Sequence, residues 1–88
     1  MIQQEVIVCN PLGLHARPAA LIVQMSSKYS SEIWLEKDGV SANAKSIMSV
    51  MMLGAAYKAS IVIRADGPQE KEAIAALVQL FDSKFNEK

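Results

Sequence analysis

Turn signals cut this chain of 88 residues into short segments, and that punctuation limits the fold more than any other feature of the sequence. The signals are Asn10-Pro11-Leu12-Gly13, Asp38-Gly39 and Asp66-Gly67-Pro68. Clusters of this kind mark turns, and Asp-Gly is typical of a two-residue hairpin. Between the turns, apolar residues recur either at every second position or at helical spacing. The resulting order is strand, helix, strand, strand, helix, strand, helix.

Four segments have the pattern of short strands, namely residues 2–9, 32–37, 40–43 and 60–66. The first contains the β-branched run Val6-Ile7-Val8, which favours extended backbone. In the second, Trp34 falls on the polar face, where it either covers the sheet edge or contacts a partner. The inward-facing residues of the second and last strands are expected to be Ile33, Leu35, Ile61, Ile63 and Ala65.

Three segments have helical spacing, namely residues 16–28, 46–53 and 69–85. Pro18 falls in the first turn of the first helix, where a missing N–H group costs nothing. The second helix is bounded by Ser46, a favoured N-cap residue, and by Gly54, a favoured residue at a helix end. In the first helix one face is formed by Ala19, Ile22, Val23 and Ser26. In the last helix the apolar residues at helical spacing are Ala73, Ile74, Leu77, Phe81 and Phe85.

Short strands with one apolar face need a cover, and amphipathic helices supply one. We therefore expect a single domain over residues 1–88, folded as an α+β two-layer sandwich. Its sheet should be mainly antiparallel, with the face away from the helices in water.

Composition excludes several classes of protein. Nine basic residues balance nine acidic ones, so nothing in the charge favours nonspecific nucleic-acid binding. Cys9 is the only cysteine, which excludes an internal disulfide and leaves a packed small residue as its expected role. No zinc site of the usual type, membrane span or signal peptide is visible, so we expect a cytoplasmic protein without a metal or cofactor.

The only histidine lies directly after the first turn and at the expected start of a helix. A helix N-terminus attracts anions through its free N–H groups and its dipole, so Ala16 and Arg17 can offer backbone donors beside His15. The Arg17 guanidinium adds a fork suited to phosphate oxygens. Imidazole is a good nucleophile near neutral pH, which makes His15 a candidate carrier of a labile phosphoryl group. The alternative is that His15 is only a cap or turn residue and Arg17 a solvated charge.

The residues around this histidine resemble a known signature. The string is Gly13-Leu14-His15-Ala16-Arg17-Pro18-Ala19-Ala20. It is similar to the active-site motif of the HPr family, the histidine-containing phosphocarriers of the bacterial sugar phosphotransferase system. The resemblance implies an open-faced sandwich, β-α-β-β-α-β-α, with a four-stranded antiparallel sheet covered on one face by three helices. It also implies that His15 accepts phosphate on Nδ1 from phospho-enzyme I and passes it to IIA domains, with Arg17 neutralising the charge.

A second cluster surrounds the short middle helix. Its apolar residues exceed what one buried face needs, so Ile47, Met48 and Met51 are candidates for an adaptable docking surface, with core packing as the alternative. Capping of this helix is by itself a sufficient reason for a serine at position 46. However, Lys45-Ser46-Ile47-Met48 also resembles the site that HPr kinase/phosphorylase modifies in regulated HPr proteins. Phosphate there would place about two negative charges beside the apolar patch and change which partners bind.

The resemblance implies further partners, including a catabolite-control transcription factor that selects the phosphoserine form. This chain departs from the commonest regulated form at Ser49 and Met52, which puts that contact in doubt. No nucleotide loop or catalytic triad is visible, so we expect a monomeric carrier and not an enzyme. The alternatives are a regulatory phosphorelay module of the same fold, uncoupled from sugar uptake, and a small phosphoesterase. The sequence names no sugar.

Overall fold

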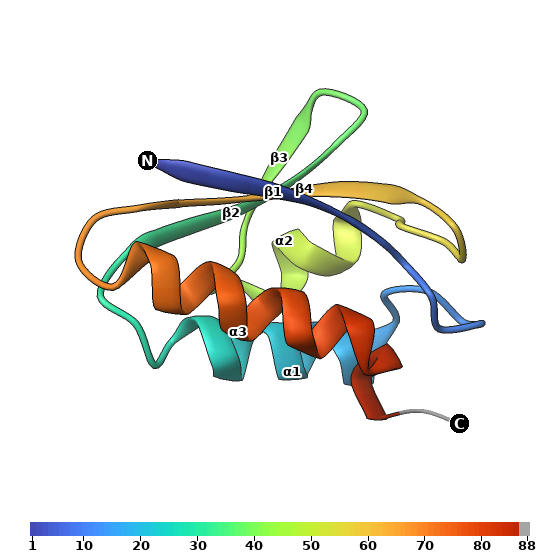
Figure 1. Cartoon of the computed structure of the whole chain (residues 1–88). Helices are drawn as coiled ribbons and strands as arrows, with labels where there is room; N and C mark the ends of the chain where they lie inside the picture. Colours follow the sequence, from blue (N-terminus) through green and yellow to red (C-terminus); the bar gives the residue numbers. More distant parts are fainter. Residues whose placement is uncertain (87–88) are drawn as a thin grey trace.

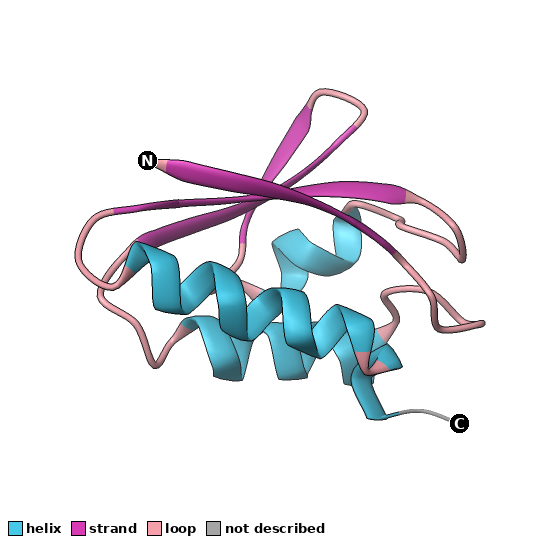
Figure 2. Cartoon of the chain, in the orientation of Figure 1, coloured by secondary structure: helices cyan, strands magenta, loops and turns pink. Residues whose placement is uncertain are grey.

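The computed structural model describes residues 1–86 and has one four-stranded sheet with helices on one face (Figures 1 and 2). The order along the chain is β-α-β-β-α-β-α, followed by a final helical turn. The elements are β1 (Ile2–Ile7), α1 (Ala16–Ser26), β2 (Glu32–Lys37), β3 (Val40–Asn43), α2 (Ile47–Met52), β4 (Ser60–Asp66), α3 (Glu70–Asp82) and the 3₁₀ turn η1 (Lys84–Asn86). The predicted open-faced architecture is confirmed.

The sheet has the spatial order β1-β4-β2-β3, and every neighbouring pair is antiparallel. The central strand β4 pairs with β1 on one side and β2 on the other, which leaves β1 and β3 as edges. Alternation places one face of each strand against the helices. The predicted inward residues, Ile33, Leu35, Ile61, Ile63 and Ala65, are all buried.

The first two elements end earlier than their apolar patterns predict. The first strand was expected to reach residue 9 but ends at Ile7, because Val8 is instead paired with the loop that precedes β4. Its N–H donates to the Ala59 carbonyl at 2.9 Å, and its carbonyl accepts from the Lys58 N–H at 2.7 Å. Likewise α1 ends at Ser26, two residues early, because the Lys28 N–H turns back to the Met25 carbonyl.

Cys9 contradicts the prediction of a packed small residue. The chain has left the sheet at this position, and the Cys9 thiol is exposed. Its Sγ lies 3.4 Å from the carbonyl oxygen of Ile7, two residues earlier.

The last predicted helix, residues 69–85, is wrong at both ends. Gln69 has a left-handed backbone and serves as the N-cap, so α3 begins at Glu70. It ends at Asp82, and Lys84, Phe85 and Asn86 then take positive φ angles. Phe85 is nevertheless buried, with its ring edge-on to Phe81 at a centroid distance of 4.9 Å. The two rings, four residues apart in the sequence, therefore make contact although the backbone between them leaves the helix.

Candidate functional site

The loop that leads into α1 is fixed by hydrogen bonds at both of its ends. The Asn10 side chain is buried, and its Nδ2 donates to the Gly13 carbonyl at 2.5 Å. The Gly13 N–H donates back to the Asn10 carbonyl at 3.0 Å, which closes the turn. The Leu14 N–H then donates to the Ala55 carbonyl at 2.9 Å, which ties this loop to the segment after α2. The backbone before His15 is thus held from two directions.

Gly13 is required by space as well as by conformation. Its φ is +68°, in the left-handed region that favours glycine. A Cβ at this position would lie 2.4 Å from the Ala55 carbonyl oxygen and 2.9 Å from the Ala56 Cα. Both contacts are with backbone, so no flexible side chain can move aside.

His15 is the N-cap residue of α1, but its side chain does not cap the helix. Its backbone is extended, with φ −76° and ψ −171°, and its carbonyl accepts the Ala19 N–H at 3.0 Å. The imidazole makes no cap hydrogen bond and is half-buried. The backbone of His15 therefore performs the capping role, and the imidazole is not used for it.

Arg17 lies in the first turn of the same helix and reaches the end of the chain. Its Nη1 donates to the Phe85 carbonyl at 2.9 Å, across 68 positions of sequence. Buried Phe85 anchors that carbonyl, so η1 positions the guanidinium. This role of Phe85 is not predicted by the sequence pattern, which places the residue in a helix. The spacing of four residues from Phe81 indicates that the Phe85 ring is buried. It does not indicate that the Phe85 carbonyl accepts a hydrogen bond from Arg17.

The two long segments on either side of β2 and its turn contain no carboxylate. Neither residues 6–31 nor residues 39–65 include an Asp or Glu, although they contain Arg17, Lys45 and Lys58. Within residues 1–86, acidic residues are confined to β1, to β2 and its turn, and to the stretch from the end of β4 through α3, which ends at Asp82. Helix α1, the loop before it and helix α2 therefore bring no negative side chain of their own to the surroundings of His15, which favours an anion there.

Ser46 caps α2 as predicted, and its Oγ accepts the Ser49 N–H at 3.3 Å. Ser46 is half-buried. The other end differs by one position, since Leu53 is the C-cap and Gly54 follows it with a φ of +61°.

The side chains of α2 divide into a buried set and an exposed set. Val50 and Leu53 are buried, as expected. The exposed fractions of the others are 42% for Ile47, 68% for Met48, 42% for Met51 and 78% for Met52. Because α2 packs against α1, this exposed patch belongs to the same side of the fold as the helix that begins at His15. We call Ile47, Met48, Met51 and Met52 the methionine patch.

Replacing Ser46 by alanine is expected to destabilise the protein by about 1 kcal/mol, because the Ser49 N–H then loses its acceptor. For a domain of this size the midpoint of thermal unfolding should fall by about 4–8 °C. Ser46→Asp is the matched control, since a carboxylate keeps an acceptor at the cap. Thermal unfolding followed by circular dichroism measures both. Equal midpoints for Ser46→Ala and the wild type would show that the cap contributes nothing.

The described part of the chain holds neither a cluster of metal ligands nor a membrane-spanning helix. Within residues 1–86, no three His, Cys, Asp or Glu side chains are grouped so that they could hold a metal ion. In the same stretch no helix is both long and apolar enough to cross a membrane.

Comparison with known proteins identifies the relatives of this chain. Residues 2–83 match the family described as PTS HPr component phosphorylation site. Phosphocarrier protein HPr of Xylella fastidiosa is 48% identical, covering 99% of this chain and 98% of the relative. Phosphocarrier protein NPr of Klebsiella oxytoca is 41% identical, covering 98% and 97%.

Solved structures agree with the sequence relatives. A crystal structure of HPr from Thermoanaerobacter tengcongensis superposes with a TM-score of 0.96 at 51% identity, covering 100% of this chain and 99% of that one. A crystal structure of an HPr dimer from the same organism has a TM-score of 0.80 at 52% identity, covering 99% and 100%.

Proposed function

Because the chain belongs to the HPr family of phosphocarrier proteins, we propose that it carries a phosphoryl group on His15 between enzyme I and IIA domains of the sugar phosphotransferase system. The observation that carries this proposal is the placement of His15. Its imidazole stands at the N-terminus of α1 without serving as the cap. On this view residues 1–88 act as one domain, and the protein is a cytoplasmic carrier and not an enzyme.

The proposed step is a transfer between two proteins. The unprotonated imidazole nitrogen Nδ1 of His15 attacks the phosphorus carried by phospho-enzyme I. A P–N bond forms to His15 as the bond from phosphorus to enzyme I breaks, and enzyme I keeps that electron pair. The reverse sequence delivers the group to a IIA domain. No cofactor enters, because the donor protein supplies the group already activated.

Three features would stabilise the phosphoryl group on His15. The Ala16 and Arg17 N–H groups lie in the first turn of α1, where the helix itself supplies no acceptor and the dipole favours negative charge. The Arg17 guanidinium is already positioned by its bond to the Phe85 carbonyl. Helix α1 and the loop before it carry no carboxylate to repel the group. We propose phosphate binding by Ala16 and Arg17 on these grounds.

We propose the methionine patch as the docking surface that enzyme I and IIA domains share. Exposed methionine side chains adapt to partners of different shape, and Met48 is 68% exposed. The absence of carboxylates from α1, α2 and the loop before α1 favours partner surfaces that are acidic around an apolar centre.

Replacing Met48 by glutamate is expected to weaken binding of enzyme I by about tenfold or more, because a charge replaces an exposed apolar contact. The fold should be unchanged, since the side chain lies largely in solvent. Gln24→Glu is the matched control, because Gln24 is also exposed but lies on α1, outside the methionine patch. Calorimetric titration with enzyme I measures all three proteins. Equal loss in both variants would mean that only net charge matters and would remove the methionine patch from the proposal.

Ser46 is proposed as a regulatory phosphosite for an HPr kinase/phosphorylase. Phosphate at the cap of α2 would suit the helix dipole and place negative charge next to Ile47. Partners that dock on the methionine patch would then bind less well. A catabolite-control transcription factor that selects the phosphoserine form would bind better.

The alternative function is a regulatory phosphorelay, favoured by the similarity to phosphocarrier protein NPr. Both functions use His15, so the acceptor distinguishes them. The test offers the phosphorylated protein equal amounts of a sugar-type and a nitrogen-type IIA domain and follows transfer to each. Faster transfer to the sugar-type domain supports the proposal, and faster transfer to the other supports the alternative. The same sample run on a sizing column tests the proposed monomer against the dimer seen for a relative.

A further inference from the structure

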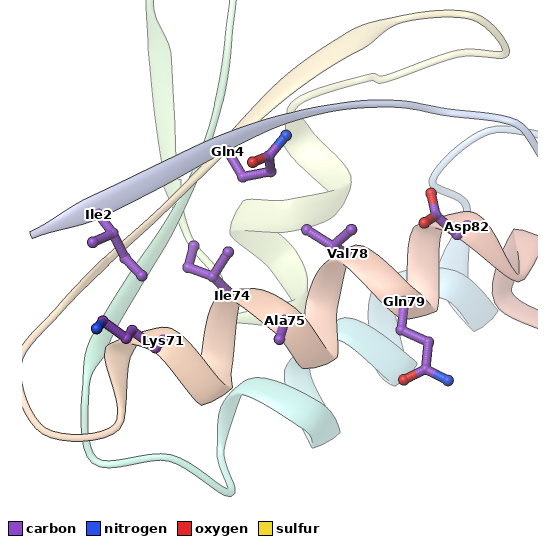
Figure 3. A pocket seen from close by; sticks show the side chains of 8 residues that line it. All are labelled: Ile2, Gln4, Lys71, Ile74, Ala75, Val78, Gln79 and Asp82. Atoms are coloured by element: carbon purple, nitrogen blue, oxygen red, sulfur yellow. The ribbon is translucent and has the colours of Figure 1, made fainter.

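A groove lies away from His15, between the edge strand β1 and helix α3. It has a volume of about 400 Å³ and shares no residue with the proposed site. Figure 3 shows Ile2 from β1 and Ile74 and Val78 from α3 pointing into the space between strand and helix. Lys71 lies at one end of the groove and Asp82 at the other (Figure 3).

The strand above this groove has a free edge. β1 is six residues long and pairs only with β4, so its other side has no strand partner in the described chain. Its register with β4 runs without interruption from Ile2 to Ile7, so no bulge disturbs the edge. Along such an edge, every second residue presents unpaired N–H and C=O groups that can accept another strand.

Charged and polar side chains can prevent strand pairing at an edge, but in β1 two of them are bonded to β4 instead. The Glu5 carboxylate accepts the Ser60 hydroxyl at 2.5 Å, and Gln3 Oε1 accepts the Arg64 Nε–H at 3.0 Å. Both bonds cross to β4, on the face of the sheet opposite the helices. The strand contains no proline and no lysine, the residues that commonly block edge pairing. Two carbonyls on this edge accept side-chain donors, Glu5 from Gln4 Nε2 at 3.1 Å and Ile7 from Cys9 Sγ at 3.4 Å. Both donor side chains are exposed, so an added strand has to displace only these two contacts.

The dimensions of the groove fit a short extended segment. From Lys71 to Asp82 helix α3 rises about 16 Å, at about 1.5 Å per residue. That length matches about five residues of β-strand, at about 3.3 Å each. Apolar side chains at alternate positions of such a segment would enter the groove over Ile74 and Val78, while its backbone pairs with β1.

The charges at the two ends of the groove, Lys71 and Asp82, determine in which direction a bound segment runs. At the Lys71 end, the Asp66 and Glu70 carboxylates are each 3.5 Å from the N-terminal ammonium of Met1, so Lys71 is the charge that faces the groove. Antiparallel pairing, the slightly more stable arrangement, places the C-terminal end of an added strand beside Ile2 and Lys71. An acidic C-terminal end would meet Lys71, and a basic residue near the N-terminal end would meet Asp82.

We propose that the groove between β1 and α3 binds an extended peptide segment of a partner protein as a fifth, antiparallel strand. The segment has apolar residues at alternate positions, a basic N-terminal end and an acidic C-terminal end. Since the groove is separate from His15 and the methionine patch, a partner can hold the carrier here while phosphoryl transfer continues.

The test titrates the ¹⁵N-labelled full chain with a heptapeptide that alternates valine and threonine between an N-terminal lysine and a C-terminal glutamate. The expected result is amide shifts confined to β1 and α3, with slowed amide exchange along β1. Ala75→Glu, which places a charge in the groove, should weaken binding by about tenfold or more. Gln24→Glu adds the same charge on the exposed surface of α1 and should bind like the wild type.

A second test exchanges the charges at the two ends of the groove, so that loss of folding cannot be mistaken for loss of binding. The wild type should prefer the heptapeptide over its charge-reversed version by about fivefold, and the double variant Lys71→Glu with Asp82→Lys should reverse that preference. Absence of shifts in β1 and α3 at millimolar peptide would overturn the proposal, as would a preference that the double variant does not reverse. Shifts at β1 that grow with protein concentration alone would also overturn it, since the occupant would then be a second copy of this chain.

Discussion

Replacing His15 by alanine is expected to abolish phosphoryl transfer from enzyme I to a IIA domain while leaving the fold stable. Transfer stops because His15 is the only histidine of the chain, so no other imidazole can accept the group. Stability should fall by about 1 kcal/mol or less, because the side chain is only half-buried and the His15 carbonyl still accepts from the Ala19 N–H. A coupled transfer assay and urea unfolding measure the two quantities.

This interpretation requires that His15→Ala loses phosphoryl transfer while it keeps most of its stability in urea. If His15→Ala lost transfer and also unfolded at much lower urea, loss of the site could not be distinguished from loss of the fold. Ser46→Ala is the control for that outcome, because it is expected to lose about 1 kcal/mol of stability while it retains transfer. Residual transfer by folded His15→Ala would contradict the proposed carrier residue.

Replacing Gly13 by alanine is expected to destabilise the protein by about 3 kcal/mol or more and to slow phosphoryl acceptance by the molecules that remain folded. The new Cβ would stand 2.4 Å from the Ala55 carbonyl oxygen, in a backbone conformation with a φ of +68°. Relief of that overlap must move the loop away from residue 55 and break the Leu14 to Ala55 hydrogen bond. His15 follows directly, so its position shifts with the loop. Urea unfolding and single-turnover transfer test this.

Gly39 supplies the matched control for Gly13. Its φ is +81°, but a Cβ there would meet no atom within 4 Å. Gly39→Ala therefore adds the conformational strain without the overlap and should cost about 1 kcal/mol. Equal destabilisation by the two substitutions would mean that the close approach to Ala55 has no energetic consequence.

The sequence predicted the fold well where pattern and local chemistry agree. The alternation of β2 and β4 and the Asp38-Gly39 turn each carry their own signal, and the structure confirms them. Ser46 is similar, since a cap needs only a hydroxyl and the N–H three residues later. In these elements the determining interactions lie within a few residues of each other.

The failures share a different cause, namely partners distant in sequence. Phe85 follows Phe81 at helical spacing, yet the backbone between them leaves the helix and the Phe85 carbonyl binds Arg17 instead. Cys9 continues an apolar run, but Val8 is already paired with the loop before β4, so the thiol lies outside the sheet. The open edge of β1 also depends on strand order, which alternation alone does not specify.

The central claim is that His15 accepts a phosphoryl group from enzyme I, and intact-mass spectrometry of the wild-type protein tests it most directly. The protein is incubated with phosphoenolpyruvate and an enzyme I of confirmed activity. We predict a gain of one phosphoryl group per chain that is lost on mild acid treatment, as expected for a P–N bond, and that His15→Ala does not acquire. An unchanged mass of the wild type, or an acid-stable gain that persists in His15→Ala, would contradict the claim.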